Sequence, residues 1–166
     1  MITLYWIPRP WPGKLAIAAR PRGSDWLDSE MPDWKNASVN AVLSRLTSHE
    51  ERDLDLARRE APVVDEGLWF ASLSVPDRYV PSSPSELAPT LDEIDAELTS
   101  GKNVVIHCRQ GVGRSGMIAR CLLVLRGIDP DSAARELEKV RGTTVPATAE
   151  QSRWIDLFAC SLTRTR

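Results

Sequence analysis

A strand, a short loop and a long helix in direct succession form the pattern that most constrains this sequence. Val104–Ile106 is a short apolar run typical of a buried strand, and residues 115–126 form a longer apolar run typical of a buried helix. Between them lie residues 108–114, which contain Gly111 and Gly113 and which we call the glycine loop. Because N–H groups at a helix start lack partners and carry partial positive charge, we expect this loop to bind an anion.

The glycine loop begins with Cys108 and ends with Arg114, and this pair adds chemistry to the expected anion site. A helix N-terminus and a neighbouring guanidinium both favour the thiolate form of a cysteine. The planar guanidinium of Arg114 also matches two phosphate oxygens. Glycines let the loop curl and bring its backbone close to a ligand. The sequence thus predicts a thiolate held against a bound phosphate, and the alternative is a core cysteine beside a turn.

The residues His107–Ser115 resemble the signature of the cysteine-dependent protein tyrosine phosphatases, and the length of 166 residues suggests their compact dual-specificity-like group. The resemblance extends from about Gly13 to Trp154. It implies a nucleophilic Cys108 and a set of phosphate-binding residues, namely Arg109, Gln110, Gly111, Val112, Gly113 and Arg114. No metal or other cofactor is expected, because the arginine and the loop N–H groups already neutralise the phosphate.

The resemblance also assigns roles to four further residues. Asp77 lies in the proline- and serine-rich segment 74–82, which is expected to be a loop, and the family carries its general acid in such a loop. The sequence alone is equally consistent with an aspartate that only forms a turn. Ser115 is expected to hydrogen-bond the departing thiolate, and His107 to orient the cysteine backbone. The family places its hydrolytic water with a glutamine that matches Gln151, which would otherwise be an exposed residue at a helix N-terminus.

These residues predict a phosphoprotein phosphatase that acts through a phosphocysteine intermediate. Phosphotyrosine is the expected substrate, with phosphoserine and phosphothreonine as further ones. Phosphoinositide phosphatases of this superfamily tend to carry lysines at positions that here hold Arg109, Gln110 and Val112, so we favour a phosphorylated protein. The alternatives are a phosphatase of RNA, phosphoinositides or small-molecule phosphates on the same scaffold, and a non-catalytic phosphate-binding module.

Composition and charge limit the compartment and the partners. The 166 residues suit one domain, residues 1–166, and a formal net charge of −2 argues against a nucleic-acid-binding surface. Three scattered cysteines without a CxxC pair fit a reducing compartment, and with two histidines they do not fall at zinc-ligand spacings. The apolar residues 1–7 are too short for a signal peptide or a membrane span. We therefore expect a cytoplasmic protein with no nucleic-acid or membrane partner, and we assume a monomer.

Apolar runs alternate with helical patterns, which predicts an α/β fold with a mostly parallel twisted sheet of four to five strands and helices on both faces. The expected strands are 4–7, 15–18, 39–43, 68–73 and 104–106, and the first two are expected to form a peripheral hairpin. The expected helices are 26–37, 48–60, 84–99, 115–126, 130–141 and 150–158. A capping box of Ser48 and Glu51 is expected to start the second helix.

Overall fold

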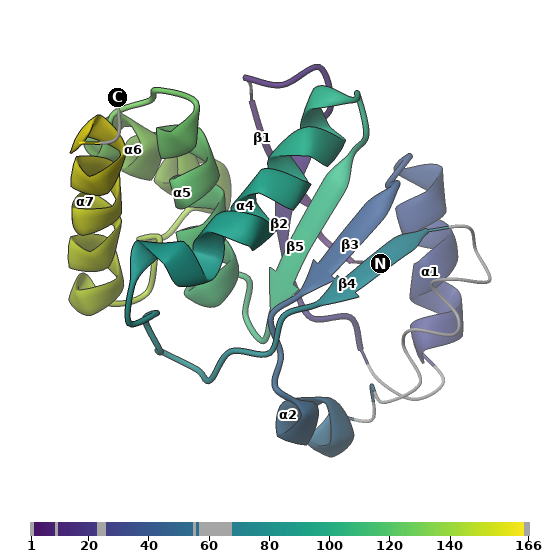
Figure 1. Cartoon of the computed structure of the whole chain (residues 1–166). Coiled ribbons are helices and arrows are strands. Elements are labelled where there is room, and N and C mark those ends of the chain that lie inside the picture. Colours follow the sequence, from purple (N-terminus) through teal and green to yellow (C-terminus); the bar gives the residue numbers. More distant parts are fainter. Residues whose placement is uncertain (1, 9, 23–25, 55, 57–67, 165–166) are drawn as a thin grey trace.

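One mixed sheet of five strands forms the centre of the molecule (Figure 1). The computed structural model describes residues 2–8, 10–22, 26–54, 56 and 68–164. The strand order is β1 (Tyr5–Ile7), β2 (Leu15–Ala19), β5 (Val104–Cys108), β3 (Ala41–Ser44) and β4 (Trp69–Ser72). Only the β1–β2 pair is antiparallel among these described strands. The predicted α/β fold with a mostly parallel sheet is therefore confirmed.

Helices cover both faces of the sheet. The described helices are α1 (Trp26–Asn36), α2 (Ser48–Asp53), α4 (Pro84–Thr99), α5 (Arg114–Leu125), α6 (Pro130–Arg141) and α7 (Ala149–Arg164). Trp34 of α1 packs with Val42 and Val105 on one face, whereas Leu43 and Ile106 point into a larger core with α4–α7. Figure 1 shows α4–α7 grouped together and α1 apart from them. No described helix is both long enough and apolar enough to cross a membrane.

Two helices begin and end where local signals predict. Helix α4 starts with Pro84 at its first turn and buries one apolar stripe, formed by Leu87, Leu91, Ile94 and Leu98. Asp129 caps α6 by accepting a hydrogen bond from the Ser132 N–H at 3.0 Å, and Pro130 follows it as the first helical residue. Gly142 ends α6 with a left-handed φ of 74°. These boundaries agree with the sequence prediction within a residue.

The predicted N-terminal strand pair lies at one edge of the sheet, with β1 outermost and β2 next to it. Strands β1 and β2 do pair as a hairpin, but β2 also pairs in parallel with β5. Residues 15–18 are completely buried, because both faces of this apolar run contact other side chains. A run without polar alternation is typical of an interior strand of a parallel sheet. The strand expected over 68–73 is instead the short edge strand β4, in which Ser72 is exposed.

The capping box of α2 lies one residue earlier than predicted. Thr47, not Ser48, accepts a hydrogen bond from the Glu50 N–H at 3.1 Å, and the Thr47 N–H donates to the Glu50 carboxylate at 2.9 Å. Thr47 has the extended backbone that an N-cap requires. The helix ends at Asp53, earlier than expected, and residues 55 and 57–60 of the predicted helix lie outside the described residues. Because Thr47 is the cap, Glu50 is the third residue of the helix and its carboxylate turns back toward the Thr47 N–H.

Three segments meet at the carboxyl-terminal ends of the strands because each follows one of three parallel strands. Strand β3 leads into α2, β4 leads into residues 73–83, and β5 leads into the glycine loop. We call residues 73–83 the Asp77 loop. The carboxyl ends of parallel strands are the usual place for a ligand site in an α/β protein. Figure 1 shows β3, β4 and β5 ending on the same side of the sheet, so the segments that carry the predicted nucleophile and the predicted acid start there.

Candidate active site

Cys108 is the last residue of β5 and lies at the floor of a small cavity. Its side chain is almost completely buried, and Sγ is 3.3 Å from the Ser115 hydroxyl on the first turn of α5. The cavity has a volume of about 160 Å³. It is lined by Asp77, Arg78, Cys108, Arg109, Gln110, Gly113, Arg114, Ala147 and Gln151. Since drug-sized ligands occupy roughly 300–1,000 Å³, this cavity suits a group of the size of a phosphoryl ester.

The glycine loop is shaped by contacts on its outer side. Gly111 has a φ of 69°, and an added Cβ would lie 2.4 Å from the Ala18 carbonyl carbon of β2, so only glycine fits there. Arg141 at the end of α6 donates from Nη2 to the Gln110 carbonyl at 2.9 Å and from Nε to the Gly111 carbonyl at 3.2 Å. Its guanidinium also lies 4.2 Å from the centre of the Tyr5 ring.

The backbone of the glycine loop presents donors without acceptors. The carbonyls of residues 109–111 accept hydrogen bonds from Arg20 and Arg141. By contrast, the N–H groups of residues 109–113 donate to no acceptor in the described part of the chain. Successive N–H groups that lack protein partners form an anion-binding nest at a helix start. The loop geometry therefore fits the anion site that the sequence predicts.

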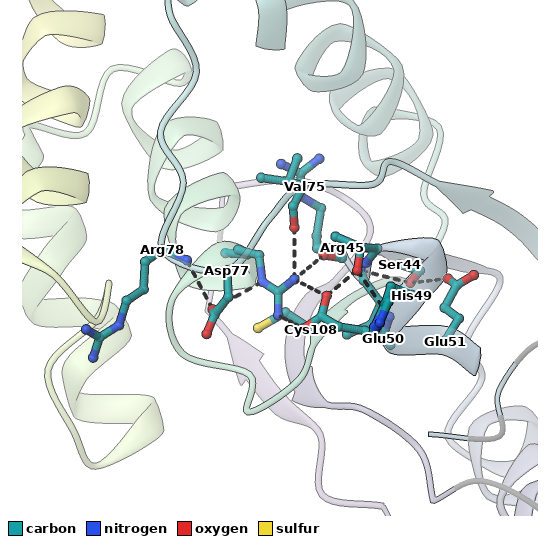
Figure 2. Close-up of polar contacts among 12 residues, drawn as sticks. Ser44, Arg45, His49, Glu50, Glu51, Val75, Asp77, Arg78 and Cys108 are labelled. Atoms are coloured by element: carbon teal, nitrogen blue, oxygen red, sulfur yellow. Dashed lines mark hydrogen bonds and ion pairs between the residues drawn. The ribbon is translucent and has the colours of Figure 1, made fainter. Parts of the chain in front are cut away.

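Arg114, the first residue of α5, is held in one orientation by four contacts. Its side chain is only 1% exposed, and Nη1 and Nη2 donate to the two Glu50 carboxylate oxygens at 2.6 and 2.8 Å. Nη1 also donates to the carbonyls of Arg45 and Val75 at 3.0 and 2.9 Å. These contacts are drawn as dashed lines in Figure 2. Nε is buried without a hydrogen-bond acceptor among the described residues, so it is available to a ligand oxygen.

The ion pair between Arg114 and Glu50 shifts the pKa values of both groups. Partial burial alone would raise the pKa of the Glu50 carboxyl, but hydrogen bonds from Arg114 and Thr47 lower this pKa to about 2. Burial alone would lower the pKa of Arg114, but the hydrogen bond to Glu50 and the nearby Cys108 raise it. Both groups are therefore charged at neutral pH. The neighbouring Arg45 is buried as well, and burial with repulsion from Arg114 lowers its pKa to about 10.

The Asp77 loop places its carboxylate at the mouth of the cavity. Asp77 Oδ1 lies 3.5 Å from Arg114 Nε, and the Asp77 side chain is 65% exposed. The loop is anchored at both ends, because the Val75 carbonyl accepts from Arg114 and the Pro81 carbonyl accepts from Trp154 Nε1 at 2.7 Å. Asp77 approaches Nε of the guanidinium, whereas Glu50 binds Nη1 and Nη2. The structure thus brings Cys108, Arg114 and Asp77 together around one cavity.

Gln151 lines the same cavity from the first turn of α7. Its side chain is completely buried, and neither amide atom has a hydrogen-bond partner in the described residues. An unpartnered buried amide is unusual and points to a polar ligand or water in the cavity. Sequence reasoning without the family resemblance favoured an exposed helix residue at this position, which is wrong.

The other predicted site residues occupy supporting positions. Gly111 and Val112 do not line the cavity: Gly111 contacts β2, and Val112 packs against the hydrophobic core. His107 is completely buried behind Cys108, where its carbonyl accepts from the Arg45 N–H at 2.9 Å. Cys121 belongs to the core, and burial raises the pKa of its thiol.

Sequence reasoning missed three residues of the site: Glu50, Arg78 and Arg141. Glu50 and Arg114 are 64 positions apart in the chain, so no local pattern joins them. The only available signal for Glu50 was the capping box, in which the glutamate bends back toward the end of β3. Arg78 directly follows the predicted acid. No group of three or more histidine, cysteine, aspartate or glutamate side chains in the described ranges is arranged to hold a metal ion.

Comparisons with known proteins find similar sequences and similar folds. The chain is 29% identical over 86 residues to cyclin-dependent kinase inhibitor 3 of Sus scrofa, a match that covers 51% of this chain. The chain spans only 40% of the length of that relative. A kinase associated phosphatase with its catalytic-site cysteine replaced by serine superposes with a TM-score of 0.87 and 19% identity, over 98% of this chain and 96% of that one.

A second solved structure, Tk-PTP in its active form, has a TM-score of 0.74 and 26% identity, and the match covers 89% of this chain and 92% of that chain. These likenesses confirm the protein tyrosine phosphatase-like fold. A family model described as PTP-SAK, Swiss Army Knife protein, DSP-PTPase phosphatase domain, matches residues 9–161. Because this match spans most of the sequence, the chain belongs to the DSP-PTPase phosphatase family of the PTP-SAK type.

Proposed function

We propose that this chain hydrolyses phosphotyrosine in proteins through a phosphocysteine intermediate. One observation carries the proposal: Cys108, Arg114 and Asp77 line one small cavity above a loop whose N–H groups have no acceptors in the described chain. A nucleophile, an anion clamp and an acid are the three functions that phosphoryl transfer to cysteine requires.

In the first step, the Cys108 thiolate attacks phosphorus and the bond to the leaving oxygen breaks. The glycine-loop N–H groups and Arg114 stabilise the equatorial phosphate oxygens, with Nε donating to one of them. An oxygen of the bound phosphate accepts from Nε in place of Asp77, whose Oδ1 lies 3.5 Å from Nε. The Asp77 carboxyl donates its proton to the leaving oxygen, so the leaving group departs as a neutral alcohol or phenol.

In the second step, water attacks the phosphocysteine and the sulfur–phosphorus bond breaks. Asp77, now ionised, accepts a proton from this water, and the buried Gln151 amide holds the water in line. Ser115, 3.3 Å from Sγ, donates a hydrogen bond to the departing thiolate. Inorganic phosphate then leaves. The clamp neutralises the phosphate with protein groups alone, so no cofactor takes part in these steps.

The choice of phosphotyrosine is supported by the glycine loop, whose variable positions hold Arg109, Gln110 and Val112 in place of the lysines expected for inositol lipids. A reducing compartment such as the cytoplasm is part of the proposal. All three cysteines are free, and a reduced Cys108 is necessary for the reaction.

The test is turnover of an aryl phosphate by wild type and by Cys108→Ser. The serine variant is expected to lose activity by more than about 10³-fold while it keeps binding phosphotyrosine peptides. Vanadate, a phosphate analogue, is the control ligand for an intact loop. Wild-type activity in the serine variant contradicts the covalent mechanism. Normal vanadate binding without turnover in the wild type favours a phosphate-binding module.

A further inference from the structure

We propose that Arg78 and Arg109 at the mouth of the cavity select substrates with a second acidic group next to the phosphotyrosine. This inference rests on the proposed function and adds the substrate class to it. The acidic group is either a carboxylate side chain or a second phosphate on a neighbouring residue, since both present the same anionic oxygens to a guanidinium.

The first argument is that both arginines line the cavity and have unused donors. Arg78 and Arg109 are exposed, and neither side chain makes a hydrogen bond or an ion pair within the described residues. The other arginines at the site differ in this respect. Arg114 is paired with Glu50, and Arg141 is bound to the loop carbonyls.

The second argument is the charge of the cavity wall. Three of the described lining residues are arginines and one is an aspartate. Glu50 already neutralises Arg114 from behind. The charges of Arg78 and Arg109 are therefore left for a ligand.

The third argument is the position of these charges outside the cavity floor. The cavity of about 160 Å³ accommodates the scissile phosphate, whereas Arg78 and Arg109 lie at its exposed rim. Figure 2 shows the Arg78 side chain extending away from the Glu50 cluster. A side chain at the rim contacts the substrate groups that lie next to the phosphotyrosine. In a peptide these are the flanking side chains, whereas an inositol polyphosphate carries all its phosphates on one small ring.

The backbone of Arg78 gives a fourth argument. Its φ is 60°, in the left-handed region that favours glycine or asparagine, and its N–H donates to Asp77 Oδ1 at 3.1 Å. The turn itself does not need a long cationic side chain. An arginine at this strained position, directly after the acid and without a protein partner in the described chain, is explained by contact with substrate.

The experiment compares kcat/KM for three phosphotyrosine peptides of one length: neutral flanks, aspartate flanks, and one neighbouring phosphothreonine. The enzymes are wild type, Arg78→Gln, Arg109→Gln, the double variant, and Arg135→Gln as control. Arg135 is exposed on α6 and does not line the cavity. The acidic-to-neutral ratio is the readout, because it cancels any loss that a substitution causes at the scissile phosphate itself.

We expect wild type to prefer both acidic peptides by about tenfold, each single variant to reduce this ratio by about two- to fivefold, and the double variant to abolish it. The ratio should fall as salt rises from 50 to 500 mM, because exposed charges are screened. Arg135→Gln should match wild type. A ratio near one in wild type, or an unchanged ratio in the double variant, overturns the inference.

Two further outcomes separate this inference from the proposed function. Wild-type turnover of the neutral peptide with no acidic preference contradicts only the selection by Arg78 and Arg109. No turnover of any peptide or aryl phosphate contradicts the proposed function and the inference together. Faster hydrolysis of a soluble inositol polyphosphate than of both acidic peptides, lost in the double variant, overturns the assignment to peptides.

Discussion

Replacing Glu50 with glutamine tests whether the ion pair with Arg114 organises the site. Glu50→Gln keeps the shape of the side chain but removes the charge that faces a guanidinium with 1% exposure. The carboxyl pKa falls from its ordinary 4.5 to about 2 on folding, which corresponds to about 3 kcal/mol of stability. Since the amide oxygen still accepts one hydrogen bond, we expect the variant to be about 2–3 kcal/mol less stable at pH 7.

The pH dependence gives the sign of this effect. The folded pKa of Glu50 lies below the unfolded value, so its contribution is complete above about pH 4.5 and is lost as pH falls toward 2. The stability difference between wild type and Glu50→Gln should therefore shrink over this range. Urea unfolding at pH 7 and at pH 3 measures the difference at each pH.

The matched control is Asp53→Asn on the same helix, whose carboxylate is 62% exposed in a pair with His49. This exposed pair should change stability by less than about 0.5 kcal/mol. We also expect Glu50→Gln to lower kcat/KM for aryl phosphates by about 10²-fold, because a misplaced guanidinium no longer matches the phosphate. Equal stability of the variant and wild type at pH 7, or a difference independent of pH, refutes the reasoning.

Three more predictions concern the acid and the glycine loop. Asp77→Asn should lower kcat/KM about 10²-fold or more for alkyl phosphates and far less for esters with good leaving groups; equal losses exclude the acid role. Gly111→Ala should abolish vanadate binding and destabilise the fold by about 1–3 kcal/mol, since its Cβ would lie 2.4 Å from Ala18 backbone; a stable variant that binds vanadate contradicts the loop geometry. Arg141→Met should weaken vanadate binding about tenfold, with partial rescue by Arg141→Lys, because two hydrogen bonds to the loop carbonyls are lost; unchanged affinity assigns Arg141 no part in shaping the loop.

Local patterns predicted much of this fold because they depend on neighbouring residues. The glycine loop follows from an apolar strand, two glycines and an apolar helix in succession, and α6 follows from Asp129, Pro130 and Gly142. The position of β2 beside β5 was not predictable in this way, because strand order depends on contacts between distant segments. The capping box was misplaced by one residue because Thr47 and Ser48 are both good caps, each followed by a glutamate three positions later.

The residues of the candidate site also differ in whether a local sequence pattern predicts them. Cys108 and Arg114 share one loop and were found from the sequence, whereas the partners of Arg114 come from α2, from Arg45 between β3 and α2, and from the Asp77 loop. Asp77 and Gln151 have no local pattern that separates them from a turn residue or a surface amide, and only the family resemblance indicated them. The long-range contacts that hold the Arg114 guanidinium could therefore be identified only from the structure.

The most direct measurement is rapid acid quenching of the wild-type enzyme during turnover of a radiolabelled phosphotyrosine peptide, followed by mass spectrometry. The label should appear on Cys108 within the first turnover, should decay as phosphate is released, and should accumulate when Gln151→Ala slows the second step. A burst of labelled Cys108 is the result that we predict. Turnover without any covalent label on Cys108, or with the label on another residue, contradicts the mechanism.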